Sequence, residues 1–125
     1  MPNKDHSIAF WESCAAYFKN KPNVIFDIFN EPYPNYVNPF GYEESWKCFR
    51  DGGWCTGISY DSAGMQSLVN AVRKVGAKNV IIVGGLSYSN DFSKWLQYAP
   101  SDSLNQIAAS AHLYNFNYCK DLSCW

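Results

Sequence analysis

The tripeptide Asn30-Glu31-Pro32 places an amide and a carboxyl side by side directly after the apolar run Val24–Phe29. A residue before proline favours extended backbone, so we expect the strand geometry to continue through Glu31 until Pro32 ends the ladder. A carboxyl presented there can protonate the leaving oxygen of a glycosidic bond and later activate water. Asn30 can hydrogen-bond a sugar hydroxyl, although adjacent strand residues converge only where the strand twists or bulges. The bare tripeptide also fits a turn with a surface glutamate.

His112 and Tyr114 form a second group, two positions apart and therefore on one face of a predicted strand. Ala108 and Ser110 precede them on that face and leave room for the larger pair. An imidazole and a phenol there can hydrogen-bond a carboxylate and tune its charge state. A lone histidine at a strand end usually makes structural hydrogen bonds, but its combination with Glu31 favours a functional site.

Gly84-Gly85 follows the predicted strand Val80–Val83. The pair lacks the third glycine, the long helix and the acidic partner of a dinucleotide-binding motif. We interpret it instead as a close approach of the backbone to a pocket, with Tyr88 as a lining residue that contacts substrate.

The elements that must position these groups alternate along the chain. The spacing of apolar residues predicts helices over Asp5–Asn20, Asp61–Val75 and Asp91–Tyr98, and strands over Val24–Phe29, Val80–Val83 and Ile107–Leu113. Runs of this kind predict a parallel α/β sheet whose strands are buried on both faces. A doubly wound sheet and a (β/α)₈ TIM barrel both fit the alternation. The chemical groups all follow strands, where the sites of barrels lie, which favours the barrel.

A whole barrel needs about 250 residues, and this chain has 125. The three predicted parallel strands with their helices cannot close, so we expect a barrel fragment. A long predicted loop, Pro32–Gly57, contains the aromatic residues Tyr33, Tyr36, Phe40, Tyr42 and Trp46. Such aromatic side chains either line a binding groove or pack onto the domain.

Five cysteines are present. Their spacing suggests two short disulfides, Cys48–Cys55 and Cys119–Cys124, with Cys14 left unpaired on a helix. No pattern of cysteine and histidine residues supports a zinc site. Disulfides imply an oxidising compartment and hence a secreted protein, although Met1–Ser7 lacks the apolar stretch of a signal peptide. Five free thiols in a cytosolic protein remain the alternative.

The net charge of −1 offers no basic excess for nucleic acid or for an anionic membrane surface. No apolar run approaches membrane-spanning length, and no cofactor motif is present.

Three segments together resemble glycoside hydrolase family 5, the cellulase family. They are Val24-Ile-Phe-Asp-Ile-Phe-Asn-Glu-Pro32, Asn79-Val-Ile-Ile-Val-Gly-Gly85 and Ser110-Ala-His-Leu-Tyr-Asn115, similar to the family's fourth, fifth and sixth strands. The resemblance implies that residues 1–125 are part of a catalytic domain acting by a retaining mechanism on a β-linked glucan or a related polysaccharide. It implies further that Glu31 is the acid/base, that Asn30 contacts the 2-hydroxyl of the cleaved sugar and that His112 and Tyr114 support them.

The family's first three strands and its nucleophile-bearing seventh strand have no counterpart in the sequence. Because a retaining hydrolase needs two carboxylates, we expect this chain alone to be inactive and to require the remaining barrel strands. A non-catalytic carbohydrate-binding barrel fragment is the alternative, and a product that associates through its exposed sheet edges is a third possibility.

Overall fold

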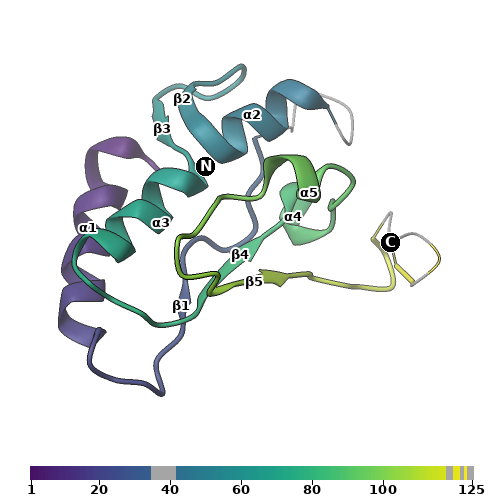
Figure 1. Ribbon diagram of the computed structural model, residues 1–125. Coiled ribbons are helices and arrows are strands. Elements are labelled where there is room, and N and C mark those ends of the chain that lie inside the picture. The colour runs from purple at the N-terminus through teal and green to yellow at the C-terminus, as the bar shows by residue number, and fades with distance from the viewer. Residues whose placement is uncertain (35–41, 118–119, 122, 124–125) are drawn as a thin grey trace.

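The computed structural model describes residues 1–34, 42–117, 120, 121 and 123, and these residues form an α/β fold (Figure 1). Its helices are α1 (Lys4–Phe18), α2 (Glu43–Asp51), α3 (Met65–Lys74), α4 (Leu86–Ser89) and α5 (Trp95–Tyr98). Its strands are β1 (Phe26–Asp27), β2 (Gly52–Trp54), β3 (Asp61–Ala63), β4 (Ile81–Gly84) and β5 (Ile107–Ser110). No helix in the described part of the chain is long and apolar enough to cross a membrane.

The three predicted strands form one parallel sheet in the order β1-β4-β5. The ladder aligns Phe26 with Ile81, and Ile81 in turn with Ile107. β1 covers only the middle of its predicted run and β5 only the first part of its run, whereas β4 has the predicted length and is displaced by one residue. The first and last strands along the chain therefore both pair with β4 and lie on opposite sides of it.

Helices cover one face of this sheet, where α1 and α3 pack against each other (Figure 1). Phe26, Ile28, Ile81 and Val83 point toward them and are buried. Asp27, between two buried residues, is exposed. The expectation of burial on both faces is therefore wrong. The predicted runs place apolar side chains on both faces of the sheet, but the helices of this chain cover only one of these faces.

The predicted loop Pro32–Gly57 contains regular structure that the sequence pattern did not reveal. Residues 43–51 form α2, and β2 then pairs antiparallel with β3. Trp46 is 0% exposed, so this aromatic belongs to the core and not to a groove. Gly52 ends α2 with φ 73°, and a Cβ there would lie 2.2 Å from the carbonyl oxygen of Ser62. Only glycine allows this close approach.

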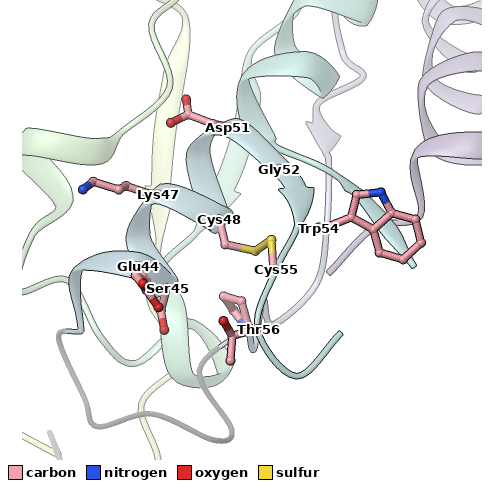
Figure 2. Close-up of a pocket in the computed structure, with 10 residues that line it drawn as sticks. Glu44, Ser45, Lys47, Cys48, Asp51, Gly52, Trp54, Cys55 and Thr56 are labelled. Atoms are coloured by element: carbon pink, nitrogen blue, oxygen red, sulfur yellow. A yellow bond between two sulfur atoms is a disulfide. The ribbon is translucent and has the colours of Figure 1, made fainter. Parts of the chain in front are cut away.

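The predicted Cys48–Cys55 disulfide is present and joins α2 to the chain just after β2 (Figure 2). It fixes the antiparallel β2–β3 pair against the helix. Cys14 is free and half-buried beside the core. The predicted Cys119–Cys124 pair lies outside the described residues.

Helix boundaries differ from the predicted ones by a few residues. The side chain of Asn3 caps α1 by accepting a hydrogen bond from the Asp5 amide, so the helix begins at Lys4. α3 begins at Met65 because the preceding Asp61–Ala63 is used as a strand. Gly76 follows α3 with φ 81° and ends it, because glycine adopts the left-handed conformation readily.

One buried ion pair orders the chain that enters β5. The guanidinium of Arg73 donates to both carboxylate oxygens of Asp102, at 2.8 and 2.9 Å, and also to the carbonyls of Ala77 and Asn79. The Asp102 side chain is 1% exposed. The Arg73 hydrogen bonds, assisted by the amides of Gln106 and Leu104, lower the Asp102 pKa to about 2. The pair thus ties α3 to the segment that leads into β5.

Candidate active site

Glu31 and His112 lie in contact although 81 positions separate them. Glu31 Oε1 is 2.8 Å from His112 Nδ1, and the side chains are 30% and 25% exposed. When Glu31 is ionised its oxygens only accept, so Nδ1 of His112 is the donor and a neutral ring then keeps Nε2 free of a proton. The contact joins the two sequence motifs into one site beyond the ends of β1 and β5.

The backbone at Glu31 departs from the expected extended geometry. Its φ is 49°, in the left-handed region, and β1 already ends at Asp27. The strand geometry therefore does not continue through Glu31, and that expectation is wrong. A left-handed glutamate costs about 1–2 kcal/mol. The unusual conformation sets the direction in which this carboxyl leaves the main chain, toward His112.

The turn after β4, which is the segment labelled α4, is a second strained segment of the site. Ser87, Tyr88 and Ser89 have φ values of 50°, 60° and 61°. Gly84 and Gly85 precede the turn, and a Cβ on Gly85 would lie 2.4 Å from the carbonyl oxygen of Asp91. The close approach at Gly85 is therefore to the main chain of Asp91, whereas the predicted approach was to a pocket, and neither glycine is among the described residues that line the cleft at Glu31.

A cleft of about 540 Å³ opens beside Glu31. Its lining residues are Glu31, Tyr33, Ser87, Tyr88, Asn90, Tyr114, Phe116 and Asn117. Tyr33 stacks on Tyr88 with ring centroids 4.2 Å apart, and Tyr114 stacks on Phe116 at 5.2 Å. Two stacked aromatic pairs thus line the cleft together with a carboxyl and two amides, a combination suited to a flat ligand rich in hydroxyl groups.

The predicted site residues are gathered only in part. Tyr88 and Tyr114 line the cleft, and His112 contacts Glu31. Asn30 is exposed and is not among the described residues that line the cleft. The roles of these side chains remain predictions, since position alone does not assign them.

Phe116 and the amide residues Asn90 and Asn117 were not identified from the sequence. Both amides donate to the carbonyl oxygen of His112, at 3.4 Å and 3.0 Å respectively. Their only sequence signal is proximity to motif residues: Asn90 follows Tyr88 by two positions, and Asn117 follows Tyr114 by three.

Glu31 is the one acid among the described residues that line this cleft. In the same part of the chain no group of three or more acidic, histidine or cysteine residues could hold a metal ion. Within the described lining of the cleft, Glu31 is therefore the one carboxyl that can donate or accept a proton. The described lining contains no second carboxylate that could attack a bound ligand.

A separate hollow of about 380 Å³ lies beside the disulfide, between α2 and β2 (Figure 2). Glu44, Lys47, Asp51 and Thr56 are among its lining residues. The ring of Trp54, at its border, points away from Glu44 and Thr56 in Figure 2. None of the predicted site residues lines this hollow, so the cleft at Glu31 is the candidate active site.

Similarity to known proteins identifies the family of the chain. Residues 2–121 match the family model described as cellulase (glycosyl hydrolase family 5). Endoglucanase Z of Dickeya dadantii is 27% identical over 118 residues, which are 90% of this chain and 21% of the relative. The chain belongs to glycoside hydrolase family 5.

Solved structures show the same fold. The structure of XacCel5A in complex with cellopentaose superposes with a TM-score of 0.58 at 27% identity, covering 86% of this chain and 31% of that one. The endo-β-1,4-glucanase Xac0029 of Xanthomonas axonopodis pv. citri gives 0.57 at 25% identity, with coverage of 86% and 31%. Endoglucanase Cel5A of Pseudomonas stutzeri gives 0.58 at 22%, covering 88% and 29%.

The chain therefore spans about a fifth of its curated relative and under a third of these solved chains. Its three parallel strands and their helices are a segment of the (β/α)₈ barrel, and both the predicted fold and the family resemblance are confirmed.

Proposed function

We propose that residues 1–125 are part of the catalytic domain of a hydrolase that cleaves O-glycosyl bonds in a β-linked glucan, with Glu31 as the acid/base. The observation that carries this proposal is the 2.8 Å contact between Glu31 and His112 beside a cleft lined by stacked aromatic rings. A hydrogen bond to Nδ1–H holds the carboxyl in one orientation, and the aromatic pairs offer faces for sugar rings.

In the proposed reaction the protonated Glu31 transfers its proton to the glycosidic oxygen as the bond from that oxygen to the anomeric carbon breaks. A second carboxylate forms a glycosyl ester with the anomeric carbon. Ionised Glu31 then removes a proton from water, which attacks the same carbon and releases the second carboxylate. The described lining of the cleft contains no such second acid, so we propose that a part of the polypeptide beyond residues 1–125 supplies it.

The proposed substrate is a β-1,4-linked glucan. Two observations support it: a related solved structure contains cellopentaose, and relatives are named as endoglucanases. We propose that Tyr88 stacks on a sugar ring and that Asn30 contacts the 2-hydroxyl, with His112 and Tyr114 supporting Glu31. Asn30 can take this role only if its exposed side chain turns toward the sugar when substrate binds.

The test is hydrolysis of cellopentaose by the complete polypeptide and by its Glu31→Gln variant. General acid–base catalysis contributes about 10²–10⁴-fold, so we expect kcat to fall by that factor while the fold is retained. Glu44→Gln is the matched control, since Glu44 is an exposed acid that lines the other hollow. Equal activity of the Glu31→Gln and Glu44→Gln variants would refute the assignment.

A second candidate function, sugar binding without turnover, applies to residues 1–125 by themselves. It is supported by exposed aromatic rings in the cleft, with Tyr88 53%, Tyr114 50% and Phe116 80% exposed. We expect the isolated chain to bind cello-oligosaccharides without cleaving them. Hydrolysis by the isolated chain that Glu31→Gln abolishes would contradict this expectation.

We also propose that the protein is secreted. The Cys48–Cys55 disulfide supports this, because structural disulfides persist in oxidising compartments. Thiol labelling of the native protein, followed by mass spectrometry, tests it: Cys48 and Cys55 are expected to be unlabelled in protein recovered from the medium. Labelling of both thiols in native material would contradict the proposal.

A further inference from the structure

The contact between Glu31 and His112 crosses the end of the strand that lies between them. β1 and β5 each pair with β4 and not with each other. Neighbouring strands lie about 4.8 Å apart, so β1 and β5 are separated by about 10 Å. The two side chains can meet at 2.8 Å only if the chain leaving β4 is held clear of the space between them.

The turn that leaves β4 is bonded to both sides of the site. Tyr88 N–H donates to the carbonyl oxygen of Pro32, the residue after Glu31, at 3.4 Å. The N–H of His112 donates to the carbonyl oxygen of Ser89 at 2.9 Å. One short turn thus contacts the main chain beside Glu31 and the main chain of His112 itself.

This turn has an unusual backbone. Three consecutive non-glycine residues, Ser87–Ser89, are left-handed, a conformation that L-residues adopt at a cost and seldom in succession. Surrounding contacts must therefore hold it in place. The contact of interest is the one between Ser89 and the last residue of β4, Gly84.

Ser89 occupies the position where a side chain of Gly84 would be. A Cβ on Gly84 would lie 2.2 Å from Ser89 Oγ, 3.2 Å from Ser89 Cβ and 3.4 Å from Pro32 Cδ. Ser89 is 1% exposed, and its hydroxyl has no hydrogen-bond partner among the described residues. The side chain of Ser89 therefore fills the space that is open because residue 84 is a glycine.

We propose that Gly84 is a positioning residue: because it has no side chain, the left-handed turn Ser87–Ser89 can pack on it, and the main-chain bond from that turn holds His112 at hydrogen-bond distance from Glu31. The contact itself is a property of the fold and can be measured directly. Its value for catalysis rests on the proposed function of Glu31.

Two substitutions and their combination test the proposal in the complete polypeptide. Gly84→Ala introduces the Cβ that collides with Ser89, and Ser89→Gly removes the two atoms it would strike. The φ of Gly84 is not left-handed, so alanine strains no backbone there. We expect Gly84→Ala to break the Glu31–His112 contact and Ser89→Gly to preserve it, because the Ser89 carbonyl still accepts from the His112 N–H. The double variant is expected to restore the contact, because of the three nearest heavy atoms only Pro32 Cδ remains, at an ordinary distance.

The readout is the ring-nitrogen spectrum of His112 from ¹H–¹⁵N NMR, recorded at a pH where imidazole is neutral and assigned by its loss in His112→Asn. The wild type and the double variant are expected to give the signal of a protonated, hydrogen-bonded Nδ1. The Gly84→Ala signal is expected to move at least half of the way toward that of Glu31→Ala. A general loss of stability would change signals throughout the protein and not the His112 ring-nitrogen signal alone.

Gly85→Ala serves as a control for the rescue. The Cβ of Gly85→Ala would strike the Asp91 carbonyl and the Phe92 ring. Ser89→Gly does not remove either of these groups, so adding Ser89→Gly to Gly85→Ala is expected not to restore the His112 signal. An unchanged His112 signal in Gly84→Ala overturns the proposal. A double variant that lacks the wild-type His112 signal also overturns it, including the case in which Gly84→Ala alone does not fold. Cellopentaose hydrolysis is measured on the same samples. Wild-type protein with the Nδ1 signal but without Glu31-dependent hydrolysis refutes the proposed function and leaves the positioning role intact.

Discussion

Replacing Asp102 by asparagine measures how strongly the Arg73–Asp102 pair holds the chain that enters β5. A pKa lowered from 3.8 to about 2 by Arg73, together with the amides of Gln106 and Leu104, corresponds to about 2 kcal/mol of folding free energy, at 1.36 kcal/mol per pH unit. Both side chains are largely buried, so little of this is lost to solvent screening. The asparagine NH₂ group would also face the guanidinium, and we expect Asp102→Asn to lower the free energy of unfolding by at least about 2 kcal/mol.

The pH dependence gives the sharper form of this prediction. Because the folded-state pKa of Asp102 lies below the unfolded-state value, its stabilisation is complete above about pH 5 and is lost as the pH falls toward 2. The difference between wild type and Asp102→Asn is therefore expected to shrink to about half at pH 3.

Urea unfolding at neutral pH and at pH 3 provides the assay. Glu12→Gln, which removes an exposed ion pair with Lys74, is the control and is expected to cost less than about 1 kcal/mol at either pH. A difference for Asp102→Asn that does not change with pH would show that the carboxylate charge does not stabilise the fold, and the reasoning would fail.

Three further predictions concern the cleft, the disulfide and the core. Tyr88→Ala is expected to weaken cellopentaose binding by about twofold to tenfold, the range of one aromatic contact, in calorimetric titrations where Tyr17→Ala, an exposed tyrosine on α1, changes nothing. Replacing both Cys48 and Cys55 by serine is expected to cost about 2 kcal/mol in urea unfolding, because the disulfide closes a short loop with a sequence separation of 7; an unchanged midpoint would contradict this. Trp46→Ala is expected to cost about 3–5 kcal/mol, whereas Trp46→Phe should cost less because it removes a buried indole N–H that has no partner in the described part of the chain; equal losses would contradict the packing argument.

The parallel sheet and its chemistry were predictable because each depends on local pattern. Short apolar runs between amphipathic helices specify parallel strands, and parallel strands bring their following residues to the same edge of the sheet. That is why Glu31, Tyr88 and His112, scattered over the sequence, could be expected near one another.

α2 was not predicted, although its sequence carries helical signals: Glu43 and Glu44 lie in its first turn and Arg50 in its last. Its buried residues Trp46 and Phe49 are three positions apart, but glycine, cysteine and aromatic residues surround them. The helix is stabilised by packing against α3 and by the Cys48–Cys55 disulfide, and such tertiary contacts override local propensity.

The left-handed backbone of the site was equally hidden. Glu31 precedes a proline, which favours extended backbone, and the residues of the turn Ser87–Ser89 are not glycine. Their conformations follow from contacts across the sheet, such as the bond between the N–H of His112 and the carbonyl of Ser89. Local rules fail at these positions because the site imposes its own geometry.

The strand order β1-β4-β5 also defines a natural place to divide the molecule. Gly76 is an exposed left-handed residue between α3 and β4, with open space around it. A break there leaves Glu31 on one piece and His112 on the other, while β4 and β1 form the seam between them. Two such half-chains, fused to a pair of interacting proteins, would re-form the carboxylate–imidazole contact only upon reassembly. The strand order thus suggests a split reporter, in which the Glu31–His112 contact forms only when the two fused proteins associate.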